Sequence, residues 1–189
     1  MGLTATATPT SLGGVFGYTT ANNNVAIGCC AGNVTMTGAD NIAIGFCALK
    51  VNTTGYSNIA LGACSLGTST IGKCNIGIGF STLRSLTTGY NNVAIGTNSL
   101  ALTTTGAGNI AIGFQSLFST LGHYNIGIGM NAVGSNTTGF NNIGQGYQAL
   151  YGNCTGTNNV AIGNQALYGY GNYSDNVSIG YQSMYSNKM

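Results

Sequence analysis

One five-residue pattern of polar and hydrophobic positions recurs along the chain at a nearly constant interval. An asparagine comes first, then a β-branched residue, a small residue, Ile or Leu, and glycine, as in Asn92-Val93-Ala94-Ile95-Gly96. Successive copies are 17 residues apart, except for one step of 16 residues from Asn109 to Asn125. The alternation predicts a short strand, because successive strand side chains point to opposite faces. The fixed period predicts a stacked array of repeats.

The asparagines that open the repeats predict a ladder of amide hydrogen bonds along the stack. Equivalent side chains of adjacent coils lie about 4.8 Å apart, within reach of amide–amide bonds. A role for the same asparagines in starting a turn is compatible with this ladder. The residues concerned are Asn24, Asn41, Asn58, Asn75, Asn92, Asn109, Asn125, Asn142, Asn159 and Asn176.

The second and fourth positions of the pattern are the expected hydrophobic core. The fourth position is Ile or Leu in nine copies, with Gln145 as the exception. The third position, between these two, is always Ala, Gly or Ser. We interpret the strand face formed by these small residues as one against which another strand or chain packs. It is the main sequence argument for an oligomer. The second position is always β-branched, which favours strands, and comprises Val25, Ile42, Ile59, Ile76, Val93, Ile110, Ile126, Ile143, Val160 and Val177.

A further apolar position follows each glycine by four residues and is mostly leucine, as at Leu49 and Leu100. It predicts a second short strand in each coil, for example over 147–150, followed by a turn with Thr-Thr-Gly at 53–55. The expected fold is all-β: a parallel β-solenoid (β-roll) of ten coils with two short strands per coil, assembled as an oligomer. Residues 1–21 are expected to form an N-terminal arm or cap, and 22–189 the solenoid.

Composition narrows the range of partners. Charged residues make up 3% of the chain, and the net charge is +2. This is too little and too scattered for nucleic-acid binding, which requires clustered Lys and Arg. No apolar run approaches the roughly 20 residues that span a bilayer, so no membrane span is expected. No signal peptide is visible at the start of the chain.

Catalytic chemistry has few candidate residues. The chain contains two Asp, no Glu and a single histidine, His123, which we expect in a turn. We therefore expect neither an enzyme nor a cofactor or metal site. Cys30, Cys47 and Cys64 occupy one repeat position, so they form a candidate disulfide or thiol ladder. The alternative is a small semi-polar ladder, because Ser, Asn and Gln continue this position in later coils, and the spacing matches no common zinc pattern.

Two further sets of side chains are candidates for binding or interface surfaces. Tyrosines are concentrated in the last quarter of the chain, and Tyr147, Tyr151, Tyr168, Tyr181 and Tyr185 form a candidate binding or interface surface. Such rings suit either a glycan or a subunit contact. Threonines recur at one repeat position and suggest an ordered hydroxyl array of the kind that binds ice; they are Thr53, Thr70, Thr87, Thr104, Thr120 and Thr137.

The stretch 158–168, Asn-Asn-Val-Ala-Ile-Gly-Asn-Gln-Ala-Leu-Tyr, together with turns such as Asn-Thr-Thr-Gly at 136–139, resembles repeats of phage tail-fibre-like proteins. It is also similar to the head repeats of trimeric autotransporter adhesins, and the resemblance covers about residues 22–186. These families imply a parallel β-roll, three chains packed together, and a role in attachment, so the resemblance makes a homotrimer the expected oligomer.

The resemblance and the repeats together lead to one functional expectation. The chain is expected to be a structural fibre or adhesin-type protein, the shaft or adhesive segment of a viral or bacterial surface appendage. Its location would be extracellular or on the virion surface, and its main partner other copies of itself. Two alternatives stay open: a filament subunit that stacks end to end, and a glycan-binding module that uses the C-terminal tyrosines.

Overall fold

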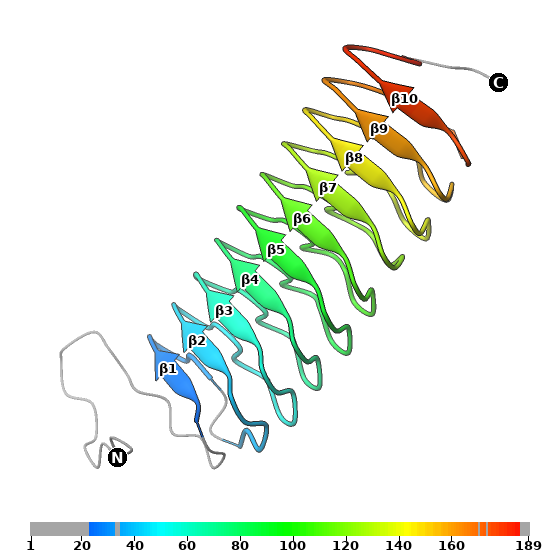
Figure 1. Cartoon of the computed structure of the whole chain (residues 1–189). Coiled ribbons are helices and arrows are strands. Elements are labelled where there is room, and N and C mark those ends of the chain that lie inside the picture. Colours follow the sequence, from blue (N-terminus) through cyan, green and yellow to red (C-terminus); the bar gives the residue numbers. More distant parts are fainter. Residues whose placement is uncertain (1–22, 33–34, 170, 173, 186–189) are drawn as a thin grey trace.

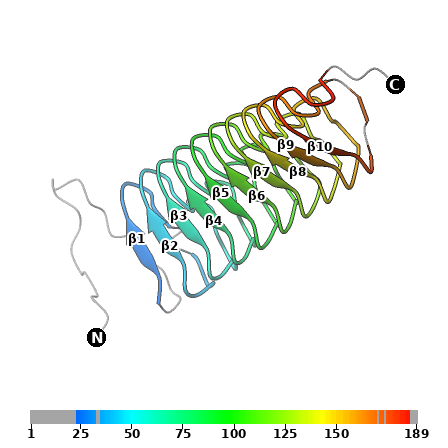
Figure 2. The same ribbon diagram turned by 45° about the horizontal axis from the view of Figure 1, so that its top comes forward.

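The chain forms one rod of stacked coils, in a computed structural model that describes residues 23–32, 35–169, 171–172 and 174–185. The described residues contain no helix, and every strand belongs to one parallel sheet in which the strand order follows the chain. Strand β1 lies at one end of the rod and β10 at the other (Figures 1 and 2). The predicted all-β solenoid is therefore confirmed. The predicted arm over 1–21 lies outside the described residues.

Each coil contributes one strand of three residues, which coincides with the central residues of the repeated pattern. Parallel neighbours pair in register, so Val93 lies opposite both Ile76 and Ile110. The strands are β1 Val25–Ile27, β2 Ile42–Ile44, β3 Ile59–Leu61, β4 Ile76–Ile78, β5 Val93–Ile95, β6 Ile110–Ile112, β7 Ile126–Ile128, β8 Ile143–Gln145, β9 Val160–Ile162 and β10 Val177–Ile179.

Each strand ends at the glycine of the pattern because the coils approach each other too closely there for a side chain. Gly45 has a φ of 133°, a value that L-residues rarely adopt. A Cβ added to it would lie 2.6 Å from the carbonyl carbon of Gly62 in the next coil. The recurring glycine thus sets the corner at which the chain leaves the sheet.

The assignment of inside and outside to the strand residues was wrong. The small middle residue of every strand is buried, whereas its two larger neighbours are half-buried or exposed. Val25 is 43% exposed and Ile95 36%. The predicted core ladder therefore lies on the outer face of the sheet; it comprises Val25, Ile42, Ile59, Ile76, Val93, Ile110, Ile126, Ile143, Val160 and Val177.

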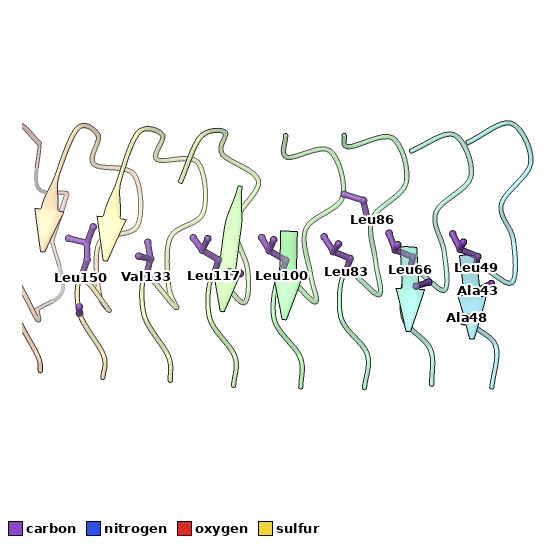
Figure 3. Close-up of a cluster of buried hydrophobic side chains, with 14 of the residues drawn as sticks. Ala43, Ala48, Leu49, Leu66, Leu83, Leu86, Leu100, Leu117, Val133 and Leu150 are labelled. Carbon is purple, nitrogen blue, oxygen red and sulfur yellow. The ribbon is translucent and has the colours of Figure 1, made fainter. Parts of the chain in front are cut away.

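The interior is too narrow for β-branched side chains at the strand. It is filled from the opposite side by a row of fully buried side chains that repeats once per coil. The row comprises Leu49, Leu66, Leu83, Leu100, Leu117, Val133 and Leu150 (Figure 3), and Leu167 in the coil that follows. A Cβ added to Gly144 would lie 2.5 Å from Cγ2 of Val133, and one added to Gly127 would lie 2.5 Å from Oγ of Ser116. The small residues of the strands are thus the partners of this row, and they offer no face to a second chain.

In the coils that the structure describes, the predicted second strand is absent, because the residues that were to form it turn instead of extending. In the segment 147–150, Gln148 has a φ of 51° and Leu150 a φ of 54°, far from the negative values of a strand. The turn still joins adjacent coils: the N–H of Leu150 donates to the carbonyl of Ala166 at 2.9 Å. Burying the leucine side chain stabilises the fold by about 2–3 kcal/mol. This offsets the cost of the left-handed backbone conformation, which is roughly 1–2 kcal/mol.

Candidate interaction surfaces of the solenoid

The predicted asparagine ladder runs through the described coils and is almost entirely buried. The Nδ2 group of Asn92 donates to Oδ1 of Asn75 at 3.0 Å and to the carbonyl of Gly106 at 2.8 Å. Its own Oδ1 accepts from the backbone N–H of Asn109 at 3.0 Å and from that residue's Nδ2 at 3.2 Å. One carboxamide thus joins three coils, and its bond to Gly106 reaches the turn that precedes the strand of the next coil. The ladder is a structural element and presents nothing to a ligand.

The outer sheet face, formed by the first and third residues of each strand, is apolar and open to solvent. Exposed fractions are 40% at Ile27, 41% at Leu61, 37% at Ile112 and 36% at Ile128. Nineteen of its twenty positions are Val, Ile or Leu, and Gln145 is the exception. The face carries no charged side chain. It is therefore a candidate surface for association with another apolar surface.

The five candidate tyrosines divide into two sets. Tyr151, Tyr168 and Tyr185 lie in neighbouring coils and stack, with ring centroids 5.7 and 5.1 Å apart and interplanar angles of 11° and 8°. Both faces of the Tyr168 ring are therefore covered by other rings. Tyr147 and Tyr181 belong to a different row and are 39% and 73% exposed. The structure does not bring the five tyrosines together as one surface.

The cysteines of the predicted ladder occupy equivalent turn positions, each with a positive φ, and all are free thiols. The Sγ atoms of Cys29 and Cys30 lie 3.6 Å apart, which is hydrogen-bonding distance for sulfur and not a disulfide. The hydrogen bond with Cys30 raises the pKa of Cys29. Partial burial raises the pKa of Cys47, although the ammonium group of Lys50 acts in the opposite direction. Thiols with raised pKa values are weak nucleophiles near neutral pH.

The threonine hydroxyls are used within the solenoid. Oγ1 of Thr53 donates to the carbonyl of Thr70 at 3.0 Å, and Oγ1 of Thr87 donates to that of Thr104 at 3.1 Å. Thr120 lies in the neighbouring row, where its carbonyl accepts from Oγ1 of Thr103 at 2.7 Å. A hydroxyl that donates to the next coil has its direction fixed by the protein. This row is therefore poorly suited to ordering water as ice does.

Groups that could support catalysis or metal binding are sparse. His123 is exposed, and its Nδ1 accepts a hydrogen bond from the backbone N–H of Ala107 at 3.1 Å, as suits a residue in a turn. Within the described ranges, no group of three or more His, Cys, Asp or Glu side chains is arranged to hold a metal ion. The same part of the chain has no helix long and apolar enough to cross a bilayer.

One set of exposed residues was missed by the sequence reasoning. The residue directly after each strand-ending glycine is a large aromatic in every second coil, and the exposed fractions are 56% for Phe46, 55% for Phe80, 45% for Phe114, 39% for Tyr147 and 73% for Tyr181. The pattern could have been found by comparing repeats two at a time. Alignment at the single-repeat period hides it, because Ala63, Thr97, Met130 and Asn164 alternate with the rings.

No family model, curated protein or solved structure matches the chain. The function therefore has to be argued from the surfaces described above.

Proposed function

We propose that this protein is a structural fibre or adhesin-type protein, in which copies of the solenoid associate through the outer sheet face. The fibre would serve as the shaft or adhesive segment of a viral or bacterial surface appendage outside the cell, and its role would be mechanical and not enzymatic. The resemblance of the repeats to phage tail-fibre-like proteins and trimeric adhesin heads supports this context.

The observation that carries the proposal is the continuous apolar outer face. Ten strands about 4.8 Å apart and three residues wide form a strip of roughly 45 Å by 10 Å, or on the order of 450 Å². This matches the largest apolar patch of typical monomeric proteins, which is often functional. The strip has the same period in every copy and no charge to oppose contact, so a second or third copy fits it in register.

The rigidity of the rod supports a mechanical role. Every coil is joined to the next by strand hydrogen bonds, by the asparagine ladder and by backbone bonds at the turns, such as that from the N–H of Leu100 to the carbonyl of Ser116 at 3.1 Å. Repeated nearest-neighbour contacts of this kind make a solenoid stiff along its whole length.

The test measures mass in solution by light scattering and shape by negative-stain electron microscopy. Rods of three-chain mass are expected for the wild type. The double variant Ile95→Lys with Ile112→Lys places two charges on the outer face and should give single-chain mass with an unchanged far-UV circular dichroism spectrum. The matched control Thr88→Lys with Thr105→Lys changes two exposed residues of the turns and should remain multimeric.

A wild-type protein of single-chain mass would contradict association through this face. Long filaments that persist in the Ile95→Lys, Ile112→Lys variant would instead favour end-to-end stacking of solenoids, the alternative form of self-assembly.

A further inference from the structure

We propose that Phe46, Phe80, Phe114, Tyr147 and Tyr181, hereafter the aromatic row, form a linear binding track for an uncharged, extended polysaccharide with β-1,4-linked pyranose units. The proposal deepens the attachment role proposed above by naming the chemistry of the surface that is held. It differs from a site made by the clustered C-terminal tyrosines, because the row runs along most of the rod and excludes the stacked Tyr151, Tyr168 and Tyr185.

The register of the coils places these residues in one straight line. The carbonyls of the first four members each accept a backbone hydrogen bond from the next coil, as those of Phe80, Phe114 and Tyr147 do at 3.0, 2.9 and 2.8 Å. The members of the row are therefore held at equivalent positions of the turn. All five side chains are more than one-third exposed.

The alternation of aromatic and non-aromatic residues keeps the rings of the row from stacking on one another. Rings in adjacent coils stack, as Tyr151, Tyr168 and Tyr185 do at 5.7 and 5.1 Å. Rings two coils apart are separated by about 9.6 Å, beyond the roughly 7 Å at which aromatic pairs interact. In the aromatic row, Ala63, Thr97, Met130 and Asn164 stand between the rings. The rings of the row are therefore not stacked on one another, and their exposure leaves them available for contact with sugar rings.

The spacing matches one polymer geometry. From single-bond lengths near 1.5 Å, the two linking oxygens of an equatorially linked pyranose lie about 5 Å apart. Successive sugars of a β-1,4 chain are rotated by about half a turn, so the same C–H-rich ring face recurs roughly every 10 Å, close to twice the spacing of the coils. Every second sugar would stack on one ring of the row.

A row of amides beside the rings supplies partners for sugar hydroxyls. The residues that follow the row positions are Asn98, Gln115, Asn131, Gln148, Gln165 and Gln182 in the later coils. Nε2 of Gln165 donates to Oε1 of Gln148 at 3.1 Å, and Nε2 of Gln182 donates to Oε1 of Gln165 at 3.0 Å. This ladder uses one N–H and one lone pair of Gln165, which leaves it capacity for one further donated and one further accepted bond.

Charge favours a neutral polymer. Neither the aromatic row nor the amide row contains Asp, Glu, Lys or Arg at any coil. Ring stacking beside uncharged hydrogen-bonding groups is typical of sites in which a few polar groups orient an apolar contact.

The test is a depletion assay of the full chain on microcrystalline cellulose and on chitin, with cellohexaose titrated by calorimetry. Soluble dextran, which has α-linkages, and polygalacturonate, which is anionic, serve as mismatched ligands. We expect binding to one or both β-1,4 polymers and none to the mismatched pair. The triple variant Phe80→Ala, Phe114→Ala, Tyr147→Ala should weaken binding between about tenfold and a thousandfold.

The matched control is Tyr56→Ala, Tyr90→Ala, Phe140→Ala, which removes three rings of similar exposure (44%, 42% and 46%) from another row. It should bind as the wild type does. A spacing variant, Thr97→Phe, adds a ring between Phe80 and Phe114 at stacking distance and should weaken binding although it adds apolar area. Circular dichroism checks that each variant is folded.

Absence of binding to both β-1,4 polymers, equal losses in the triple variant and its control, or tighter binding by Thr97→Phe would each overturn the proposal. A change of mass in the triple variant would assign the row to contacts between copies and overturn it too. Binding by a protein of single-chain mass would leave the track standing and contradict only the association through the outer sheet face.

Discussion

Replacement of Asn92 by alanine tests whether the buried amide ladder holds neighbouring coils together. The side chain is fully buried and makes four hydrogen bonds, two donated and two accepted. Removing it leaves the carbonyl of Gly106 and the backbone N–H of Asn109 without the partners described here. Each buried backbone group left unpaired costs about 1–3 kcal/mol. The expected loss is therefore about 2–6 kcal/mol, before any contribution from the cavity.

The measurement combines urea unfolding with hydrogen exchange resolved by mass spectrometry. Because coils contact only their neighbours, the loss should appear first as faster exchange in the segments around Asn92 and Asn109, with distant coils less affected. The control is Asn91→Gly. Asn91 is the preceding residue, is exposed, and has a φ of 56°, which glycine adopts without strain. This control should change stability by less than about 1 kcal/mol.

The isosteric variant Asn92→Asp adds a pH test of the same reasoning. An aspartate keeps the shape but replaces the donating Nδ2 with an acceptor that faces Oδ1 of Asn75 and the carbonyl of Gly106. Burial among acceptors should raise the folded-state pKa of this carboxyl above its unfolded value of about 3.9. The folded state then binds more protons, so the variant should regain stability as pH falls through the raised pKa and lose it as pH rises. A loss under about 1 kcal/mol for Asn92→Ala, or an Asn92→Asp variant without this pH dependence, would refute the argument.

Two other predictions address the interior and the thiols. Leu100→Ala should cost about 2–5 kcal/mol in urea unfolding, because it empties a fully buried site, whereas Ile95→Ala, at a site 36% exposed, should cost about 1 kcal/mol or less; equal costs would contradict the assignment of inside and outside. Iodoacetamide should alkylate Cys29 and Cys47 more slowly in the native protein than in urea at pH 8, because both thiol pKa values are raised on folding; peptide mass spectrometry would measure the rates, and faster native alkylation would contradict it.

The periodic features of this chain are those that the sequence makes predictable. A constant interval between equivalent asparagines implies that they stack, and the ladder and strand register follow from this alone. Which strand face is buried does not follow. A period of two determines which residues share a face, but not which face is turned inward. In this chain the width of the coil decides, since the row that includes Leu100 and Leu117 fills the interior and leaves space at the strand only for Ala, Gly or Ser.

The turn conformation was also beyond sequence reasoning. Leucine rarely adopts a positive φ, so a leucine such as Leu66, with a φ of 51°, gives no local signal of a left-handed turn. The apolar character of this leucine correctly predicts that it is buried. It wrongly predicts an extended backbone. The difference arises because a coil of 17 residues must reverse direction within a few residues of each strand, and this geometric demand overrides local preference.

The observed burial still favours self-association of the chain, but through a different set of residues. The small residues that had suggested a second chain are interior, but the Val and Ile residues that were assigned to the core now form an exposed apolar face in their place. The tyrosine rings likewise differ in their contacts according to the coils in which they lie. Tyr151, Tyr168 and Tyr185, in consecutive coils, cover one another's faces and stiffen the rod, whereas Tyr147 and Tyr181, two coils apart, do not. In this solenoid, the interval between equivalent rings therefore decides whether they stack on one another.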